Sequence, residues 1–400
     1  MQLCFFSDND ASNLFPLTIT RPVDELRIGI LKINEKWLNL LNISKFSRIT
    51  PDYLEGVFKP ENIDSTQDCI WINSRYLPNK EIASSILELG GNNAITSQGE
   101  IVAIKLSGEK SEELYSSKSF DPGKLKFSSQ EMECSSVKYL WDMLSLNANE
   151  IIADIELLSL NSLLEKGELD NCITVNEENI FISGKATVEP GCILNASAGP
   201  IFIGANAKLE SGSIIKGPVA ICEGATTKMA ARIYDGTTIG PVCKVGGEVA
   251  NSIFHSYSNK GHDGFVGNSL IGEWCNFGAD TNTSNLKNNY SLVKLPHWET
   301  QEVYGSGVQF FGTVLADHSK TSINTMLNTG TLCGVSSNLF SSGFPPKYIP
   351  SFSWLSDSGV QVYDFEKAII AMRAMMKRRD VELSQEYYEM MKFIFENRDA

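Results

Sequence analysis

The sequence predicts an α/β N-terminal domain, followed by a parallel β-helix and a C-terminal helix. The strongest observation is a six-residue period, in which almost every sixth residue from Ile203 to Val245 is a branched aliphatic. Such a period fits neither an α-helix, at 3.6 residues per turn, nor an ordinary half-buried strand, at two. It fits a parallel β-helix, in which each hexapeptide forms one side of a triangular coil and points its aliphatic residue to the axis. The positions are Ile203, Leu209, Ile215, Ile221, Thr227, Ile233, Ile239 and Val245.

The hexapeptides extend beyond this run in both directions. They begin near Ile182, slip by three residues at the Ala-Gly-Pro near position 199, and end near Val335. At three hexapeptides per turn, this length predicts roughly eight or nine turns. We place the β-helix at residues 176–345 and a linker helix before it at residues 151–175.

Two stretches interrupt the period. It breaks between Val249 and Val266, and it is absent from Leu286 to about Gly312. The second stretch predicts an inserted loop or hairpin.

Residues 1–150 read as alternating strands and helices, which predicts an α/β layer domain. Short apolar runs suit buried strands, and apolar residues at helical spacing indicate helices. The predicted strands are Leu3–Phe6, Cys69–Ile72 and Ile101–Leu106, and the predicted helices are Asp24–Leu41, Asn79–Leu89 and Val137–Leu146. Residues 107–136 predict an exposed connection.

Residues 346–400 change pattern again and predict a helical segment from Asp364 to Asn397. Its apolar stripe is rich in methionine, which is typical of a packing face. The stripe consists of Phe365, Ile369, Met372, Met376, Leu383, Tyr387, Met391 and Ile394.

Composition narrows the possible partners. The formal net charge is −14 with no sizeable run of lysine and arginine, so a nucleic-acid role is disfavoured. Phosphorylated ligands remain possible, because a few placed cations can serve one site. The nine cysteines include no Cys-x-x-Cys pair, which favours reduced core thiols over disulfides or zinc. No signal peptide or membrane-spanning run is evident, so we expect a cytoplasmic protein without membrane partners.

A regular coil offers little chemistry, so the breaks in the period are where functional residues are expected. The stretch 259–290 is dense in polar groups and contains His262 between Gly261 and Gly264. Two glycines can give this segment an unusual backbone course. An imidazole suits proton removal near neutral pH. A surface or core histidine is the usual alternative, but this setting favours a functional one.

The solenoid resembles the acetyltransferase half of the bifunctional enzymes that form UDP-N-acetylglucosamine, glucosamine-1-phosphate N-acetyltransferase/N-acetylglucosamine-1-phosphate uridyltransferase. That family has a left-handed β-helix and a motif Lys-x-Gly-His-x-x-Tyr-x-Gly-Asp, whose histidine is the catalytic base. This sequence reads Asn-Lys-Gly-His262-Asp-Gly-Phe265-Val-Gly267-Asn268. Phenylalanine therefore replaces the tyrosine, and asparagine replaces the aspartate. The family's second lysine before the histidine aligns with Ala250.

The resemblance implies further site residues. The family's Asn-x-Gly-Ala-Gly-Thr is matched by Asn276-Phe-Gly278-Ala279-Asp-Thr281, and Asn285-Leu-Lys-Asn follows. It implies that an arginine thirty residues before the histidine and a lysine bind the sugar phosphate. It also implies that an asparagine binds sugar hydroxyls and that acetyl-CoA lies near the next segment. The corresponding residues are Arg232 and Lys287 or Lys294 for the phosphate, Phe265 and Asn276 for the sugar, and Ala279 and Asn285 for acetyl-CoA.

The implied reaction is direct acyl transfer. His262 would take a proton from the sugar's amino group, which attacks the thioester carbonyl of acetyl-CoA. Backbone amides of adjoining coils would stabilise the oxyanion. The family binds acetyl-CoA between neighbouring subunits, which implies a homotrimer.

The beginning of the chain resembles sugar nucleotidyltransferases. Leu14-Phe-Pro16-Leu-Thr18 and then Arg21-Pro22 match their Leu-x-Pro-Leu-Thr and Arg-Pro-Lys stretch. The glycine-rich phosphate loop of those enzymes is replaced by Ser7-Asp-Asn-Asp-Ala-Ser12, and their Gly-Asp magnesium ligand by Asn73-Ser-Arg75. The resemblance leaves Arg21 and Asn73 as candidate nucleotide-binding residues. It implies Mg²⁺ only if this domain is active; no other metal is expected.

Three functions follow from these patterns. The first is an acetyl-CoA-dependent N-acetyltransferase acting on an amino-sugar phosphate, such as glucosamine 1-phosphate. The second is a fully bifunctional enzyme that also forms a UDP-sugar from a sugar 1-phosphate and UTP, which the missing glycine loop disfavours. The third is a non-catalytic trimeric scaffold or ligand-binding regulator, which His262 and its neighbours disfavour.

Overall fold

In the computed structural model, which describes residues 2–160, 169 and 171–398, the chain divides into two compact units. The first consists of residues 1–14, 21–26 and 31–142. The second consists of residues 15–20, 27–30 and 143–400. Two short N-terminal segments therefore pack within the unit that contains the solenoid.

The first unit is built on a six-stranded mixed sheet of order β2-β1-β3-β5-β4-β6. Strand β1 lies parallel to β2 and β3, and β5 runs antiparallel to β3 and β4. The strands are β1 Gln2–Phe6, β2 Ser47–Arg48, β3 Cys69–Asn73, β4 Asn93–Ser97, β5 Glu100–Leu106 and β6 Ser128–Glu131. The helices are α1 Ile33–Leu41, α2 Asp52–Glu55, α3 Lys80–Leu87 and α4 Gly108–Ser116. The α/β class and all three predicted strands are confirmed.

Two expectations for this unit are wrong. The predicted helix over 24–41 is helical only from Ile33, after a 3₁₀ turn at Val23–Glu25. Between them Gly29 has a φ of +77°, and a Cβ there would lie 2.5 Å from a carboxylate oxygen of Asp154, so tertiary packing overrides the helical pattern. The predicted connection at 107–136 contains α4 and β6, and α4 begins where the Ser107 side chain accepts a hydrogen bond from the Lys110 amide.

Helix α5, Leu140–Leu160, leads to the solenoid. It continues through residues predicted as two separate helical segments. Residues 161–168 and 170 of the predicted linker helix lie outside those the structure describes, and residues 173–175 form the first solenoid strand.

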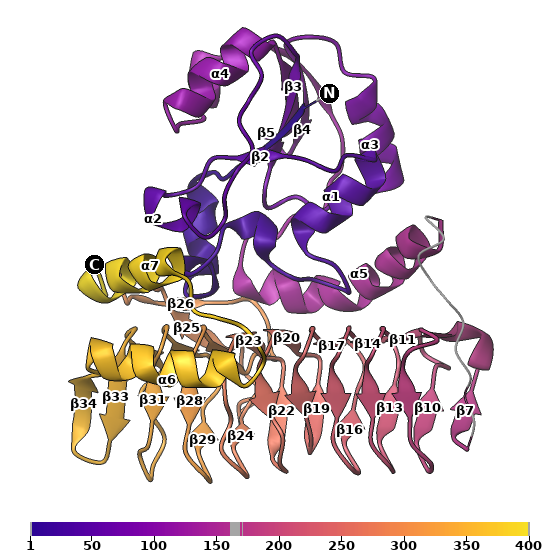
Figure 1. The fold of residues 1–400 in the computed structure, drawn as a ribbon, viewed down its shortest axis with the longest axis vertical. Helices are drawn as coiled ribbons and strands as arrows, with labels where there is room; N and C mark the ends of the chain where they lie inside the picture. The colour runs from indigo at the N-terminus through magenta and orange to yellow at the C-terminus, as the bar shows by residue number, and fades with distance from the viewer. Residues whose placement is uncertain (1, 161–168, 170, 399–400) are drawn as a thin grey trace. The chain divides into compact units, whose positions relative to one another are not determined.

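The solenoid has three parallel faces, which we name A, B and C in the order that the chain visits them (Figure 1). Face A comprises β7 Ile173–Val175, β10 Ile193–Asn195, β13 Ile214–Lys216, β16 Arg232–Ile233, β19 Glu248–Ala250, β22 Phe265–Gly267, β24 Asn282–Thr283 and β29 Met326–Leu327. Face B comprises β8 Ile180–Ile182, β11 Ile201–Ile203, β14 Val219–Ile221, β17 Thr237–Ile239, β20 Ile253–Ser256, β23 Leu270–Glu273, β27 Thr313–Leu315, β30 Thr331–Cys333 and β32 Tyr348–Ile349. Face C comprises β9 Thr187–Val188, β12 Lys208–Leu209, β15 Thr226–Thr227, β18 Lys244–Val245, β21 Asn259–Lys260, β28 Lys320–Thr321, β31 Asn338–Leu339 and β33 Ser353–Ser356, with β34 Gly359–Val362 added antiparallel.

The six-residue ladder forms the axis of this solenoid, as predicted. Ile203, Leu209 and Ile215 lie on faces B, C and A in turn, and each is fully buried. In-register parallel pairing then places like positions above one another, as in Ile203 against Ile221. The stretch 284–312 is an insertion that carries the antiparallel hairpin β25 Lys294–Pro296 and β26 Val303–Gly305, as predicted.

The C-terminal region forms two helices, α6 Phe365–Lys377 and α7 Gln385–Glu396. The predicted segment over 364–397 is interrupted because Asp380 adopts a left-handed φ of 56° and Ser384 caps a new helix through the Tyr387 amide. The methionine stripe packs inward, with Met372, Met376 and Met391 at most 4% exposed. Among the described residues no helix is long and apolar enough to cross a membrane.

All nine cysteines are free thiols, as expected. Seven are buried, and burial raises the pKa of those at the solenoid axis, including Cys243, Cys275 and Cys333. They serve as small apolar side chains.

Candidate functional site

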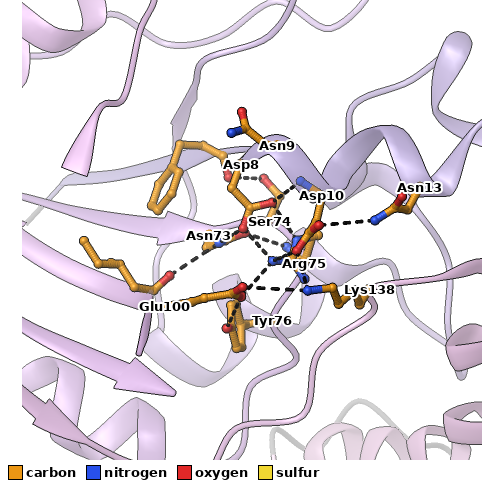
Figure 2. Close-up of polar contacts among 12 residues, drawn as sticks. Asp8, Asn9, Asp10, Asn13, Asn73, Ser74, Arg75, Tyr76, Glu100 and Lys138 are labelled. Carbon is orange, nitrogen blue, oxygen red and sulfur yellow. Dashed lines mark hydrogen bonds and ion pairs between the residues drawn. The ribbon is translucent and has the colours of Figure 1, made fainter. Parts of the chain in front are cut away.

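The first unit gathers a polar cluster where strands β1 and β3 end (Figure 2). Asp8 and Asp10 follow β1, and Arg75 follows β3. Because the carboxyl ends of adjacent parallel strands meet at one edge of a sheet, these side chains lie close together. The Arg75 guanidinium donates from Nε to Oδ1 of Asp8 at 2.7 Å and from Nη2 to Oδ2 at 2.6 Å. Nη2 also reaches Glu100 at 3.0 Å and Asp10 at 3.4 Å.

The charged side chains of this cluster pair with one another. The Arg75 side chain is 0% exposed, and although burial opposes its charge, the hydrogen bonds and charge of Asp8 raise its pKa. Burial opposes the charge of Asp8 too, but hydrogen bonds from Arg75 and Asn73 outweigh it, so the pKa of Asp8 is lowered. Lys138 binds Asp10 at 2.9 Å, and this bond raises the pKa of the lysine.

These residues do not fit a magnesium–nucleotide site. The Asp8 carboxylate already accepts from Arg75 and from Nδ2 of Asn73, the latter at 2.6 Å. Within the described residues, no group of three or more His, Cys, Asp or Glu side chains is arranged to hold a metal ion. Asn73 is thus engaged inside the cluster, and Arg21, the other candidate, is buried at 4% exposure. An arginine stands where the nucleotidyltransferase pattern has a metal-binding aspartate.

In the second unit, the break in the six-residue period contains a buried lysine. Strand β21 lies inside it, and Lys260 pairs with Val245, so the lysine takes the inward position of an aliphatic residue. Its Nζ donates to the carbonyl oxygens of Gly246 and His262, both at 2.9 Å. Burial lowers the pKa of Lys260 to about 8, because Asp263 and Asp280 only partly offset the desolvation and Arg232 adds to the lowering.

His262 lies at the corner between faces C and A, directly above this buried lysine. Its side chain is exposed. The corner is fixed by Lys260 and by Gly264, whose φ is +116° and where a Cβ would lie 2.3 Å from the Thr281 carbonyl oxygen. Ala279 occupies the same corner one coil further on, since the Asp280 amide donates to the Asp263 oxygen. The structure therefore places His262 and Ala279 along one edge.

Two other predicted residues lie on face A beside this edge. Arg232 is on β16, half-exposed, with Nε 3.4 Å from Oε2 of Glu248. Glu248 pairs in turn with Phe265 of β22, so the three side chains form one column along the face. The Phe265 amide donates to Oδ1 of Asn282 at 2.8 Å, which continues the column.

The remaining predicted residues are dispersed. Asn285 begins the insertion, and its Nδ2 donates to Oδ1 of Asn268 at 2.7 Å. Lys287 lies in the insertion with Nζ on the Leu292 carbonyl oxygen at 2.7 Å, and Lys294 is exposed on the hairpin strand β25. Asn276 is on face C, between Asn259 and Lys320.

Sequence reasoning missed Lys260 and Lys320. A signal for Lys260 existed, since counting one period back from Val266 places a lysine at an axial position. Lys320 has an outward register position, and its burial depends on helix α6, more than forty residues later. No local pattern could have indicated it.

Comparisons with known proteins find a family model, related sequences and solved structures that are similar to parts of this chain. Residues 3–162 match the family model described as a sugar nucleotidyl transferase. The bifunctional protein GlmU of Methanocaldococcus jannaschii is 31% identical over 194 residues, which cover 48% of this chain and 40% of that relative. That of Methanococcus vannielii is 29% identical over 189 residues, 47% of this chain and 42% of the relative. Over about half of its length the chain is therefore similar to bifunctional GlmU proteins.

An uncharacterized acetyltransferase, YaiX of Escherichia coli O6:K15:H31, is 25% identical over 177 residues, 43% of this chain and 73% of the relative. Among solved structures, an N-acyltransferase of Bacillus cereus, AntD, aligns over 55% of this chain and 96% of its own at 15% identity, with a TM-score of 0.22. The chain spans about two fifths of the length of the GlmU relatives that it matches.

Proposed function

We propose that this protein is an acetyl-CoA-dependent N-acetyltransferase whose acceptor is an amino-sugar phosphate such as glucosamine 1-phosphate. The observation that carries the proposal is the exposed imidazole of His262 at a solenoid edge, on a turn held by Lys260 and Gly264. A general base must reach its substrate while its own backbone stays fixed, and this turn meets both requirements.

His262 takes a proton from the acceptor's ammonium group, and the freed amine attacks the thioester carbonyl of acetyl-CoA. A tetrahedral oxyanion forms, and backbone amides along the edge of the solenoid stabilise it. Collapse of this intermediate releases the second proton of the nitrogen to solvent, forms the amide and expels the coenzyme A thiolate, which takes up the proton from His262. No covalent enzyme intermediate is required.

Arg232 holds the acceptor phosphate, and its position on face A supports that role. Its guanidinium is half-exposed, with Nε 3.4 Å from Oε2 of Glu248, and its charge is close enough to Lys260 to lower the pKa of that lysine. Phe265 lies in the same column and offers an apolar surface to the sugar ring. Lys287 or Lys294 supplies a second cation to the phosphate, Ala279 and Asn285 contact acetyl-CoA, and Asn276 contacts sugar hydroxyls.

A homotrimer completes the proposed site, with acetyl-CoA bound between neighbouring copies. Face A exposes apolar side chains that a partner copy would cover, since isolated solenoid faces seldom leave several in one column. These are Ile173 at 61%, Val175 and Ile214 at 42%, and Met326 at 39% exposure.

The first unit is proposed to lack nucleotidyl transfer. The nucleotide would meet Asp8 and Asp10 where the family has glycine amides, and the buried cation beside them, Arg75, already binds those carboxylates. A measurement of pyrophosphate release from UTP, Mg²⁺ and N-acetylglucosamine 1-phosphate should give no signal above background. Release at rates of one per second or faster would contradict this part of the proposal.

The acceptor is tested by thiol release from acetyl-CoA with three matched sugars. Glucosamine 1-phosphate should support release, while glucose 1-phosphate lacks the amine and glucosamine lacks the phosphate. Equal rates with glucosamine and glucosamine 1-phosphate would show that the acceptor does not need a phosphate group. The absence of release with any amino-sugar phosphate would favour a non-catalytic scaffold.

A further inference from the structure

A pocket of about 340 Å³ lies in the second unit, between face C of the solenoid and helix α6. The solenoid supplies Tyr257, Asn259, Trp274, Asn276 and Lys320, and the helix end supplies Ala374, Met375, Arg378 and Arg379. His262 is not among these lining residues. Figure 1 shows α6 running alongside the last rungs of the solenoid.

The solenoid wall of the pocket is a column of outward side chains. Asn259, Asn276 and Lys320 pair with one another on successive coils, so their side chains project from face C about 4.8 Å apart. Lys244 precedes them in the same column, paired with Asn259. Four polar side chains therefore stand in line beneath the helix.

Three of the nine lining residues are cations, and none is a carboxylate. This concentration stands out in a chain with a net charge of −14. Arg379 donates from Nη2 to Oδ1 of Asn259 at 3.0 Å, while its buried Nε has no hydrogen-bond partner among the described residues. Lys320 donates to the His318 carbonyl oxygen at 2.8 Å.

Two lysines of this column have lowered pKa values. Burial lowers the pKa of Lys320 to about 8. Burial, followed by the charges of Arg379, Lys228 and Arg378, lowers the pKa of Lys244. Positive charges held close together without a matching carboxylate are stabilised by a bound anion.

An aromatic stack forms another wall. Tyr257, Trp274 and His318 occupy the same corner of successive coils, each with a left-handed φ between 57° and 62°. The Tyr257 and Trp274 rings stack at 4.2 Å and 8°, and Trp274 lies 6.2 Å from the His318 ring at 10°. Nε2 of His318 lies 2.8 Å from the Tyr387 hydroxyl of α7, which ties the stack to the C-terminal helices.

We propose that this pocket binds a phosphorylated small molecule, whose phosphate oxygens accept hydrogen bonds from Lys320, Arg378 and Arg379. The side-chain amides of Asn259 and Asn276 face the polar remainder of the ligand, and the rings of Tyr257 and Trp274 form a wall beside it. Charge-assisted hydrogen bonds from lysine and planar arginine are the usual means of holding phosphate. Asn276 is the one residue shared with the proposed acetyl-transfer site, and the phosphate-binding cations Lys320, Arg378 and Arg379 have no role in that proposal.

The test is isothermal titration of the full chain at pH 7 and low salt, with glucose 1-phosphate, inorganic pyrophosphate and glucose as probes. Glucose 1-phosphate and pyrophosphate should bind, and uncharged glucose should not. The double variant Arg378→Gln/Arg379→Gln should weaken phosphate binding about tenfold or more. Lys320→Gln should do the same through the solenoid wall.

Two controls separate this site from others. Arg373→Gln removes an exposed arginine from the same helix and should leave the affinity unchanged. His262→Ala should also leave it unchanged, so failure of the acetyl-transfer proposal would be distinguishable. Far-UV circular dichroism and melting temperature establish that each variant is folded. The proposal is overturned if neither phosphate probe binds the wild type, if glucose binds as well as glucose 1-phosphate, or if Arg373→Gln weakens binding as much as the pocket variants.

Discussion

The Arg75 guanidinium donates two parallel hydrogen bonds to the Asp8 carboxylate, at 2.7 and 2.6 Å, from a fully buried position at the end of strand β3. Each side chain thus satisfies the charge of the other. This pairing is the basis of our proposal that the first unit lacks nucleotidyl transfer, since a fold does not by itself imply an activity.

Replacing Arg75 should destabilise the first unit strongly. Arg75→Gln leaves the carboxylates of Asp8, Asp10 and Glu100 close together without their shared cation, and loss of one partner from a buried pair costs about 3–5 kcal/mol. Because Asp8 is 28% exposed, we expect a loss of about 2–4 kcal/mol in the free energy of unfolding, measured by urea titration. The control Lys124→Gln removes a surface partner of Asp121 and should change it by less than about 1 kcal/mol. Similar losses in both variants would contradict a dominant role for the Arg75 cluster.

Lys260 should make stability depend on alkaline pH. Its folded pKa of about 8 lies below the ordinary lysine value of about 10.4, so the unfolded chain binds more protons between those values. Stability therefore rises as pH increases from about 8 to about 10, by up to roughly 3 kcal/mol from this residue. Lys260→Met should remove the part of this increase in stability that Lys260 contributes, while the part that Lys320 contributes remains.

The measurement compares urea unfolding of wild type and Lys260→Met at pH 7 and pH 10. Lys216→Met, at a half-exposed lysine on face A, is the matched control and should behave as wild type. Parallel pH profiles in wild type and Lys260→Met would show that the buried amine does not titrate as described.

The two glycines beside His262 should respond differently to alanine. Gly264 has a φ of +116° and no room for a Cβ, whereas a Cβ at Gly261 meets nothing within 4 Å. Gly264→Ala should therefore displace the turn, lowering the melting temperature and reducing thiol release at least tenfold, while Gly261→Ala keeps both close to wild type. Equal activity in both variants would mean that the course of this turn does not position His262.

Face A should mediate self-association. Ile214→Asp places a charge at one of the exposed apolar side chains of this face and should shift the mass measured by light scattering from trimer towards monomer. The control Lys185→Asp changes an exposed charge elsewhere on the solenoid and should leave the mass unchanged. A monomeric wild type, or a trimer unaffected by Ile214→Asp, would contradict the assembly.

The sequence allowed the architecture to be predicted because the solenoid is a repeat. Each inward aliphatic residue meets the same environment on every coil, so the period alone reveals the faces and the axis. The helix predicted from residue 24 failed because Gly29 packs against residues more than a hundred positions away. Periodicity carries no information about such contacts.

The candidate site was predictable only in part. The residues around His262 share a short motif, so its corner could be found from spacing. The α6 pocket could not, because Lys320 and Arg379 become neighbours only after the last coil returns the chain to face C. The interruption of the period was itself informative, since it contains a lysine at an axial position.

The measurement that tests the account most directly is the rate of thiol release from acetyl-CoA and glucosamine 1-phosphate in wild type and His262→Ala. Because His262 is exposed, the substitution should leave the melting temperature unchanged. Loss of a general base predicts a decrease of about 10²–10⁴-fold in kcat. A folded His262→Ala variant that releases thiol at the wild-type rate would contradict the assignment of His262 as the base.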